Sequence, residues 1–146
     1  MTKPIQYWIM KSEPDEYSFD DLVREGKTLW DGVRNYQARN NMKAMAVDDR
    51  VLIYHSISEK ALVGIAKVSQ TAFPDPTITG ENPKGWVVVE LVPVQPLQKS
   101  INLQTLKTHA TLCEIALVKQ SRLSVIPLDK ADYETILALS ETKAMQ

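Results

Sequence analysis

Aromatic, amide and basic side chains are concentrated in residues 30–40, which read Trp-Asp-Gly-Val-Arg-Asn-Tyr-Gln-Ala-Arg-Asn. This stretch joins two predicted helices, where a Trp is either buried or part of a cavity wall. The face of Trp30 could stack on a nucleic-acid base, a contact worth roughly 1–3 kcal/mol. Arg34 and Asn35 could supply donors and an amide to a base edge. The alternatives are core packing for Trp30, which composition alone favours, and a helix cap for Asn35.

Two other groups of residues could support hydrolytic chemistry. His55 directly precedes Ser56, which places a base beside a hydroxyl in the sequence. Adjacent residues of a strand point to opposite faces, so this pair cannot act as nucleophile and base within a strand. Glu13, Asp15 and Glu16 could share acid and base roles. A solvated turn explains these carboxylates better, because acidic side chains are stabilised near a helix N-terminus.

Metal ions and nucleotide cofactors are not predicted. His109 and Cys113 are one helical turn apart, but a structural zinc ion needs about four ligands. The five glycines are scattered and lack the spacing of a phosphate-binding loop. We therefore expect no metal, no cofactor, and no ATP, GTP or NAD as a partner.

The charge of the chain argues against strong non-specific binding to nucleic acid. The net charge is −1 and the pI is near 6.1, whereas such binding depends on clusters of Lys and Arg. One local stretch differs, because residues 32–47 carry Arg34, Arg39 and Lys43 and no acidic residue. It fits a phosphate contact and a solvated helix face equally well.

Length and composition predict one domain over residues 1–146. The chain has 146 residues, of which 44% are hydrophobic, enough for one core. The single cysteine, Cys113, excludes an intrachain disulfide and suits a reducing compartment. No segment approaches the roughly 18 uninterrupted apolar residues of a membrane span, and the first residues lack a signal-peptide layout. We expect a cytoplasmic protein without a membrane partner.

Hydrophobic periodicity, caps and breakers predict the elements that position these residues. Strands are expected at residues 6–10, 51–55, 61–68, 86–92 and 123–126. Helices are expected at residues 18–26, 35–46, 103–109 and 129–139. Residues 73–80 are expected to form a loop because of their prolines. Pro93 and Pro96 should end the fourth strand, and Gly64 should mark a bulge or a close approach of two chain segments.

The order of these elements indicates the α+β class. Strand and helix do not alternate as they do in a parallel doubly wound sheet. Clustered strands with helices beside them predict a strongly bent sheet or a small barrel.

Several blocks resemble the EVE-domain family, which includes the thymocyte nuclear proteins. The most specific blocks are Lys-Ser-Glu-Pro at residues 11–14 and Trp-Asp-Gly-Val-Arg-Asn at residues 30–35. Further matches lie at residues 49–56, 73–77 and 122–127. Together they span Tyr7 to about Leu139. The family usually has Gly-Asp before the second strand, where this chain has Asp48-Asp49, so the turn there could use an Asp with positive φ.

The resemblance implies a PUA-like fold, a mixed curved sheet closing into a small barrel with flanking helices, related to YTH domains. It also implies a non-catalytic reader of a modified base, such as modified cytosine or methylated adenine, in DNA or RNA or as a modified nucleoside. Carried over by position, the candidate pocket residues are Lys11, Ser12, Glu13, Trp30, Val33, Arg34, Asn35, Tyr54, His55, Ser56 and Asp75.

These residues have expected roles. Trp30 would stack on the ring, and Ser12 and Asn35 would pair with its polar edge. Arg34 or Lys11 would hold a phosphate. Two alternatives remain open: a hydrolase that acts on a modified nucleoside or nucleotide in the same pocket with Lys11, Glu13 and His55, and a protein-binding module that uses the helix from Arg34 to Lys43. The oligomeric state is also open.

Overall fold

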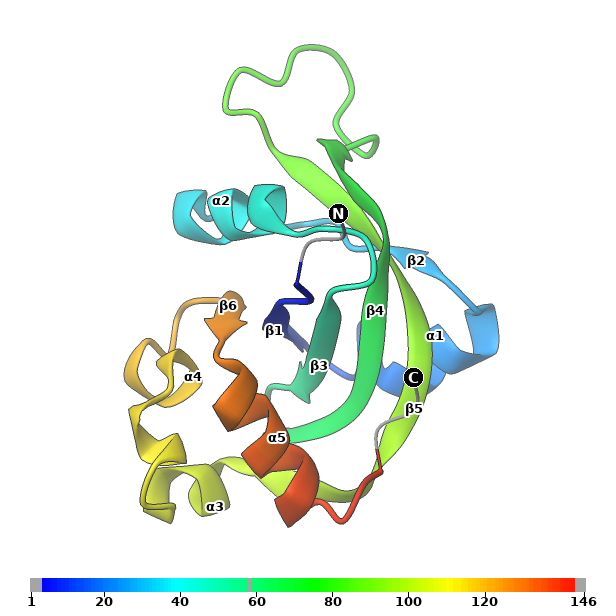
Figure 1. Ribbon diagram of the computed structural model, residues 1–146. Coiled ribbons are helices and arrows are strands. Elements are labelled where there is room, and N and C mark those ends of the chain that lie inside the picture. The colour runs from blue at the N-terminus through cyan, green and yellow to red at the C-terminus, as the bar shows by residue number, and fades with distance from the viewer. Residues whose placement is uncertain (1–3, 58, 144–146) are drawn as a thin grey trace.

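A mixed six-stranded sheet forms the centre of the computed structural model, which describes residues 4–57 and 59–143 (Figure 1). The strands are β1 (Tyr7–Ser12), β2 (Thr28–Leu29), β3 (Arg50–His55), β4 (Ala61–Pro74), β5 (Val87–Asn102) and β6 (Val125–Leu128). The helices are α1 (Phe19–Glu25), α2 (Tyr36–Ala44), α3 (Leu103–Thr108), α4 (Ala116–Lys119) and α5 (Lys130–Leu139), with a 3₁₀ turn at Leu112–Glu114.

The sheet order is β2-β5-β4-β3-β1-β6. Strands β1 and β3 are parallel, and the other neighbours are antiparallel. The two end strands, β2 and β6, do not pair with each other in the described part of the chain, and the sheet is not closed into a barrel. The predicted mixed sheet with flanking helices is therefore confirmed, whereas its closure is not.

The helices are distributed around this sheet. In Figure 1, α3, α4 and α5 gather at one end of the molecule, and α2 lies at the other end above β6. The loop of residues 75–86 projects beyond that second end and joins β4 to β5. None of the helices within the described ranges is long and apolar enough to cross a membrane.

The predicted end of the fourth strand at Pro93 and Pro96 is wrong, because β5 continues to Asn102. The register between β4 and β5 shifts between Ile65 and Ala66, where Gln95 and Pro93 are the partners. Strand β2 pairs with β5 only at Glu90 and Leu91, so β5 is an edge strand beyond that point. A proline at an edge or bulge removes no ladder hydrogen bond.

The predicted loop at residues 73–80 begins too early. Strand β4 extends to Pro74 because Phe73 and Pro74 pair with Val88 and Val87. The expected special role of Gly64 is confirmed. The register shifts there, and a Cβ atom at Gly64 would clash with the ring of Phe19.

The predicted caps are also confirmed. Ser18 and Asp21 form a capping box at the start of α1, and Asn35 caps α2 by accepting a hydrogen bond from the Ala38 amide at 2.9 Å. Asp48 takes a φ of 75°, which is the positive φ expected of the turn before β3. Asn and Asp tolerate this region better than most residues.

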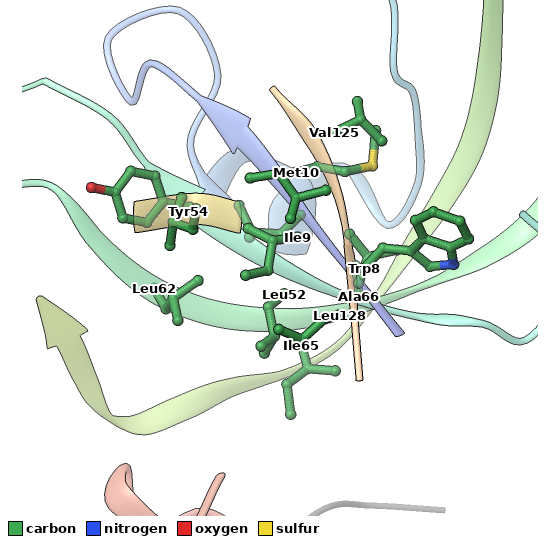
Figure 2. Close-up of a cluster of buried hydrophobic side chains, with 14 of the residues drawn as sticks. Trp8, Ile9, Met10, Leu52, Tyr54, Leu62, Ile65, Ala66, Val125 and Leu128 are labelled. Carbon is green, nitrogen blue, oxygen red and sulfur yellow. The ribbon is translucent and has the colours of Figure 1, made fainter. Parts of the chain in front are cut away.

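The core lies around the parallel pair. Residues Val51 to His55 of β3 are all buried, because both faces of the strand are covered. Figure 2 shows side chains of β1, β3, β4 and β6 meeting in this core, with Trp8 at one side and Tyr54 at the other. The parallel pair is thereby held rigid, and its carboxyl end leads into the candidate site.

Candidate functional site

A cavity of about 650 Å³ opens at the carboxyl end of the β1–β3 pair. Drug-sized ligands and cofactors occupy pockets of roughly 300–1,000 Å³. The residues that line this cavity are Lys11, Ser12, Glu13, Glu16, Tyr17, Thr28, Leu29, Trp30, Asp31, Gly32, Val33, Arg34, Ser56, Ser121 and Ser124. The end of β1, the segment between α1 and α2, and the segment before β6 therefore meet at one place.

The strand side of the cavity is fixed by hydrogen bonds between neighbouring segments. The Ser56 amide donates to the Ser12 carbonyl at 2.9 Å, which joins the ends of β1 and β3. The Ser12 hydroxyl donates to the Tyr17 carbonyl. The ammonium group of Lys11 donates to the Ser121 carbonyl at 2.6 Å, and burial lowers the pKa of Lys11. This side of the cavity is held in place before any ligand enters.

The opposite side is built around Trp30. Its amide donates to the Val89 carbonyl at 2.8 Å, continuing the short pairing of β2 with β5. The Tyr17 ring meets the indole edge-on, with centroids 6.2 Å apart and an interplanar angle of 87°. Trp30 is 9% exposed and belongs to the hydrophobic core, yet it also lines the cavity. The two alternatives for Trp30, core packing and cavity wall, therefore coexist.

Tyr17 completes this wall from the turn before α1. Its hydroxyl donates to the Glu25 carboxylate at 2.7 Å. Burial, together with the neighbouring Glu25, raises the pKa of Tyr17 to about 12. The phenol is therefore neutral at physiological pH and already engaged, so its contribution to the cavity is its ring.

A buried carboxylate orients Arg34 at the rim of the cavity. The Nη1 atom of Arg34 lies 3.0 Å from Oδ2 of Asp75 and also donates to the Val33 carbonyl at 2.9 Å. Burial alone would raise the pKa of Asp75, but hydrogen bonds from Thr77 and Arg34 outweigh it and hold this pKa below its ordinary value. The Arg34 side chain remains 40% exposed, so its other N–H groups can reach a ligand.

The charges around the cavity favour a neutral ligand. Three carboxylates, those of Glu13, Glu16 and Asp31, line it beside only two cations, Lys11 and Arg34. The Lys11 ammonium is already engaged with a carbonyl, and Arg34 with Asp75. A phosphate group inside would face net repulsion, whereas a heterocycle with N–H groups would find acceptors.

Four predicted site residues do not line this cavity. The side chain of Asn35 is used as the cap of α2, and Tyr54 is 4% exposed in the core (Figure 2). His55 accepts a hydrogen bond from the Phe19 amide at 3.1 Å, and its other ring nitrogen faces Glu59. Asp75 does not reach the cavity itself but binds the guanidinium of Arg34. The other seven, Lys11, Ser12, Glu13, Trp30, Val33, Arg34 and Ser56, do line it.

Several residues that line the cavity were not predicted from the sequence. Asp31 and Gly32 lie within the block that suggested the site, and their position was the available signal. Tyr17 could have been noticed as an aromatic residue in an otherwise polar turn. Ser121 and Ser124 come from a segment about a hundred residues away, and no local pattern connects them to β1. Tertiary structure alone brings them together.

A second hollow of about 310 Å³ adjoins the first and shares Ser121 with it. Its lining includes Asn35, Gln37, Gln120, Arg122 and Leu123. Within residues 4–57 and 59–143, no three His, Cys, Asp or Glu side chains are grouped so that they could hold a metal ion.

Comparison with known proteins identifies a family. The model of the EVE domain matches residues 6–139. Thymocyte nuclear protein 1 of Mus musculus is 34% identical to this chain over 94% of the chain and 74% of its own length.

Solved structures agree with this match. A crystal structure of a Pseudomonas syringae protein is 43% identical, with a TM-score of 0.85 over 92% of this chain and 99% of that one. Human THYN1 in a complex with DNA that contains 5-methylcytosine is 31% identical, with a TM-score of 0.86 over 94% of this chain and 99% of that one. A YTH domain from Zygosaccharomyces rouxii is 15% identical with a TM-score of 0.57, a likeness of fold alone.

Proposed function

Because the chain belongs to the EVE-domain family, we propose that it is a non-catalytic module that binds a modified base of nucleic acid in the cavity beside Trp30. The observation that carries this proposal is the cavity itself, with an aromatic wall and a surplus of carboxylates. The human relative forms a complex with DNA that contains 5-methylcytosine. Modified cytosine is therefore the first ligand to test, followed by methylated adenine, in DNA or in RNA.

In this proposal the base stacks beside Trp30 and its polar edge meets Ser12 and the neighbouring carboxylates. The indole N–H of Trp30 makes no hydrogen bond with any described residue, so it is also available to a ligand. Extruding a base costs a few kcal/mol, which stacking and edge hydrogen bonds offset. A methyl group in an apolar niche adds roughly 1–3 kcal/mol of discrimination, without catalytic chemistry.

The hydrolase alternative is weaker. It needs Lys11, Glu13 and His55 in one site, but His55 lies outside the cavity lining, and one of its ring nitrogens accepts from the Phe19 amide. A ring nitrogen that accepts a backbone hydrogen bond is not free to act as a base.

We propose that the module acts in the cytoplasm, as the composition suggests.

Calorimetric titration with single nucleosides tests the proposal. The panel is 5-methyl-2′-deoxycytidine, N6-methyladenosine and their unmodified counterparts. We expect one modified nucleoside to bind, and Trp30→Leu to weaken it about tenfold or more, since base–aromatic stacking is worth roughly 1–3 kcal/mol. Trp30→Phe should restore part of the affinity.

Trp8→Phe is the matched control, because it alters an indole that is sealed in the core away from the cavity. Circular dichroism at the assay temperature establishes that each variant is folded. If the wild-type protein binds none of these nucleosides, alone or within a strand, the proposed function is wrong. If folded Trp30→Leu binds as well as wild type, the base does not lie beside Trp30.

A further inference from the structure

Four side chains form a continuous stack that begins at the cavity rim. The guanidinium of Arg34 lies 5.7 Å from the centroid of the Trp86 ring. Trp86 stacks on Tyr36, with centroids 5.3 Å apart and an interplanar angle of 20°. The guanidinium of Arg39 lies 5.0 Å from the Tyr36 centroid. We call Arg34, Trp86, Tyr36 and Arg39 the arginine–aromatic stack.

The stack is well supported, although it lies at the surface. The Asn82 side chain pairs with both the amide and the carbonyl of Trp86, at 3.0 and 2.8 Å. The Arg39 guanidinium donates to the Lys84 carbonyl at 2.5 Å, which ties the loop of residues 75–86 to α2. Tyr36 is nevertheless 53% exposed. Arg39 and Trp86 are half-buried, so the stack is held in place yet open to solvent at Arg34 and Tyr36.

No carboxylate of the described residues neutralises the charge of Arg39. Its guanidinium donates to the Lys84 carbonyl and to the Asn40 side-chain oxygen, and both acceptors are neutral. These bonds use three of the five N–H groups of a guanidinium, which leaves two for a ligand. In the described part of the chain, Lys43 and Lys84 also form no ion pair. Arg39, Lys43 and Lys84 therefore contribute three positive charges that no carboxylate of the described residues pairs with.

We propose that the arginine–aromatic stack holds a phosphate of a nucleotide that neighbours the base in the cavity, so that the natural ligand is a nucleic-acid strand rather than a free nucleoside. The inference rests on the proposed function. The three acidic residues that line the cavity disfavour a phosphate there, so the backbone is expected to leave the cavity where cations are concentrated. Arg34 lies at that point, since it lines the cavity and begins the stack. A guanidinium fixed on an aromatic face is suited to bidentate phosphate binding.

The test compares one modified base in two forms, as a nucleoside and within a short single-stranded oligonucleotide. We expect Arg39→Gln to weaken oligonucleotide binding about tenfold at low salt, because a hydrogen-bonded charge contact is lost. The slope of log affinity against log salt should fall by about 1. Nucleoside binding should not change. Lys107→Gln removes a charge from α3, at the far end of the molecule in Figure 1, and should change neither.

Tyr36 tests whether the stack orients Arg39. Tyr36→Phe keeps the ring, and the hydroxyl makes no hydrogen bond with a described residue, so oligonucleotide affinity should be retained. Tyr36→Leu removes the aromatic face and should weaken oligonucleotide binding about threefold to fivefold.

Each outcome has a defined consequence. If the nucleoside and the oligonucleotide bind equally tightly, or if Arg39→Gln behaves like Lys107→Gln, the strand proposal is wrong while base binding stands. If Arg39→Gln weakens binding to an acidic peptide instead, the surface serves a protein partner and the strand proposal is also wrong. If neither form of the base binds the wild-type protein, both proposals fall together.

Discussion

Two tryptophans occupy similar depths in the molecule but very different polar surroundings. Trp8 is 3% exposed, and its indole nitrogen donates to Oδ2 of Asp49 at 3.0 Å. The same carboxylate accepts from the amides of Gln6 and Ala46, at 3.0 and 2.9 Å. Trp30 is 9% exposed, and its indole nitrogen has no hydrogen-bond partner among the described residues.

The difference separates a structural site from the candidate binding site. Around Trp8, a carboxylate that is 1% exposed accepts three hydrogen bonds from the protein and has no direct access to a ligand. Around Trp30, the carboxylates line a cavity, and Arg34 and the indole keep unused donors. Burial of an aromatic ring therefore does not decide its role. What distinguishes the two sites is whether the polar groups near the ring already have hydrogen-bond partners within the protein.

The largest effect is expected at Asp49, where Asp49→Ala should reduce the free energy of unfolding by about 3 kcal/mol or more. The change leaves three donors without their acceptor, and each buried unsatisfied group costs roughly 1–3 kcal/mol. Urea denaturation measures the loss. Asp48→Asn is the neighbouring control, which should stay within about 0.5 kcal/mol because the residue is exposed and Asn tolerates positive φ. A small loss for Asp49→Ala would mean that the Trp8 site is not structural.

The sequence predicted the fold more completely than it predicted the Asp49 site. Local signals are strong where neighbours in the chain make the structure, as in the capping box of Ser18 and Asp21 or the cap at Asn35. Strand β2 has two residues and leaves no pattern to detect. The lengths of β4 and β5 depend on each other through bulges, so prolines that normally end strands were misleading.

The candidate site was predicted only in part, because local sequence signals do not reveal which distant segments meet in the fold. The blocks at residues 11–14 and 30–35 contain consecutive residues that line the cavity. Whether Tyr54 or His55 turns toward it depends on which face of β3 is covered, and both faces are buried. The hydrogen bond from Lys11 to Ser121, and the ring contact of Tyr36 with Trp86, join distant segments that single-sequence patterns cannot pair.

An intermediate effect should distinguish the two tryptophans directly. Trp8→Phe and Trp30→Phe remove the same atoms, but only the first breaks a hydrogen bond to a carboxylate. We expect Trp8→Phe to cost about 1.5–3 kcal/mol more than Trp30→Phe, the range for a hydrogen bond to a charged group. Parallel urea denaturation curves measure this difference. Equal losses of unfolding free energy in the two variants would mean that the hydrogen bond from Trp8 to Asp49 does not distinguish the two sites.

The smallest effect on stability is expected at Asp75, a buried carboxylate that holds Arg34 at the cavity rim. Asp75→Asn should destabilise the protein by about 1 kcal/mol near neutral pH, because the partner Arg34 is partly exposed and solvent screens the pair. The pKa of folded Asp75 lies below its ordinary value, since hydrogen bonds from Thr77 and Arg34 outweigh burial. Its stabilisation is therefore complete above the unfolded value, near pH 3.9, and is lost as the pH falls through the lower folded value. The stabilities of wild type and Asp75→Asn, measured by denaturation from pH 7 to pH 2, should converge only below about pH 4. If the gap instead closes between pH 7 and pH 5, Asp75 is not the group that holds Arg34 at the cavity rim.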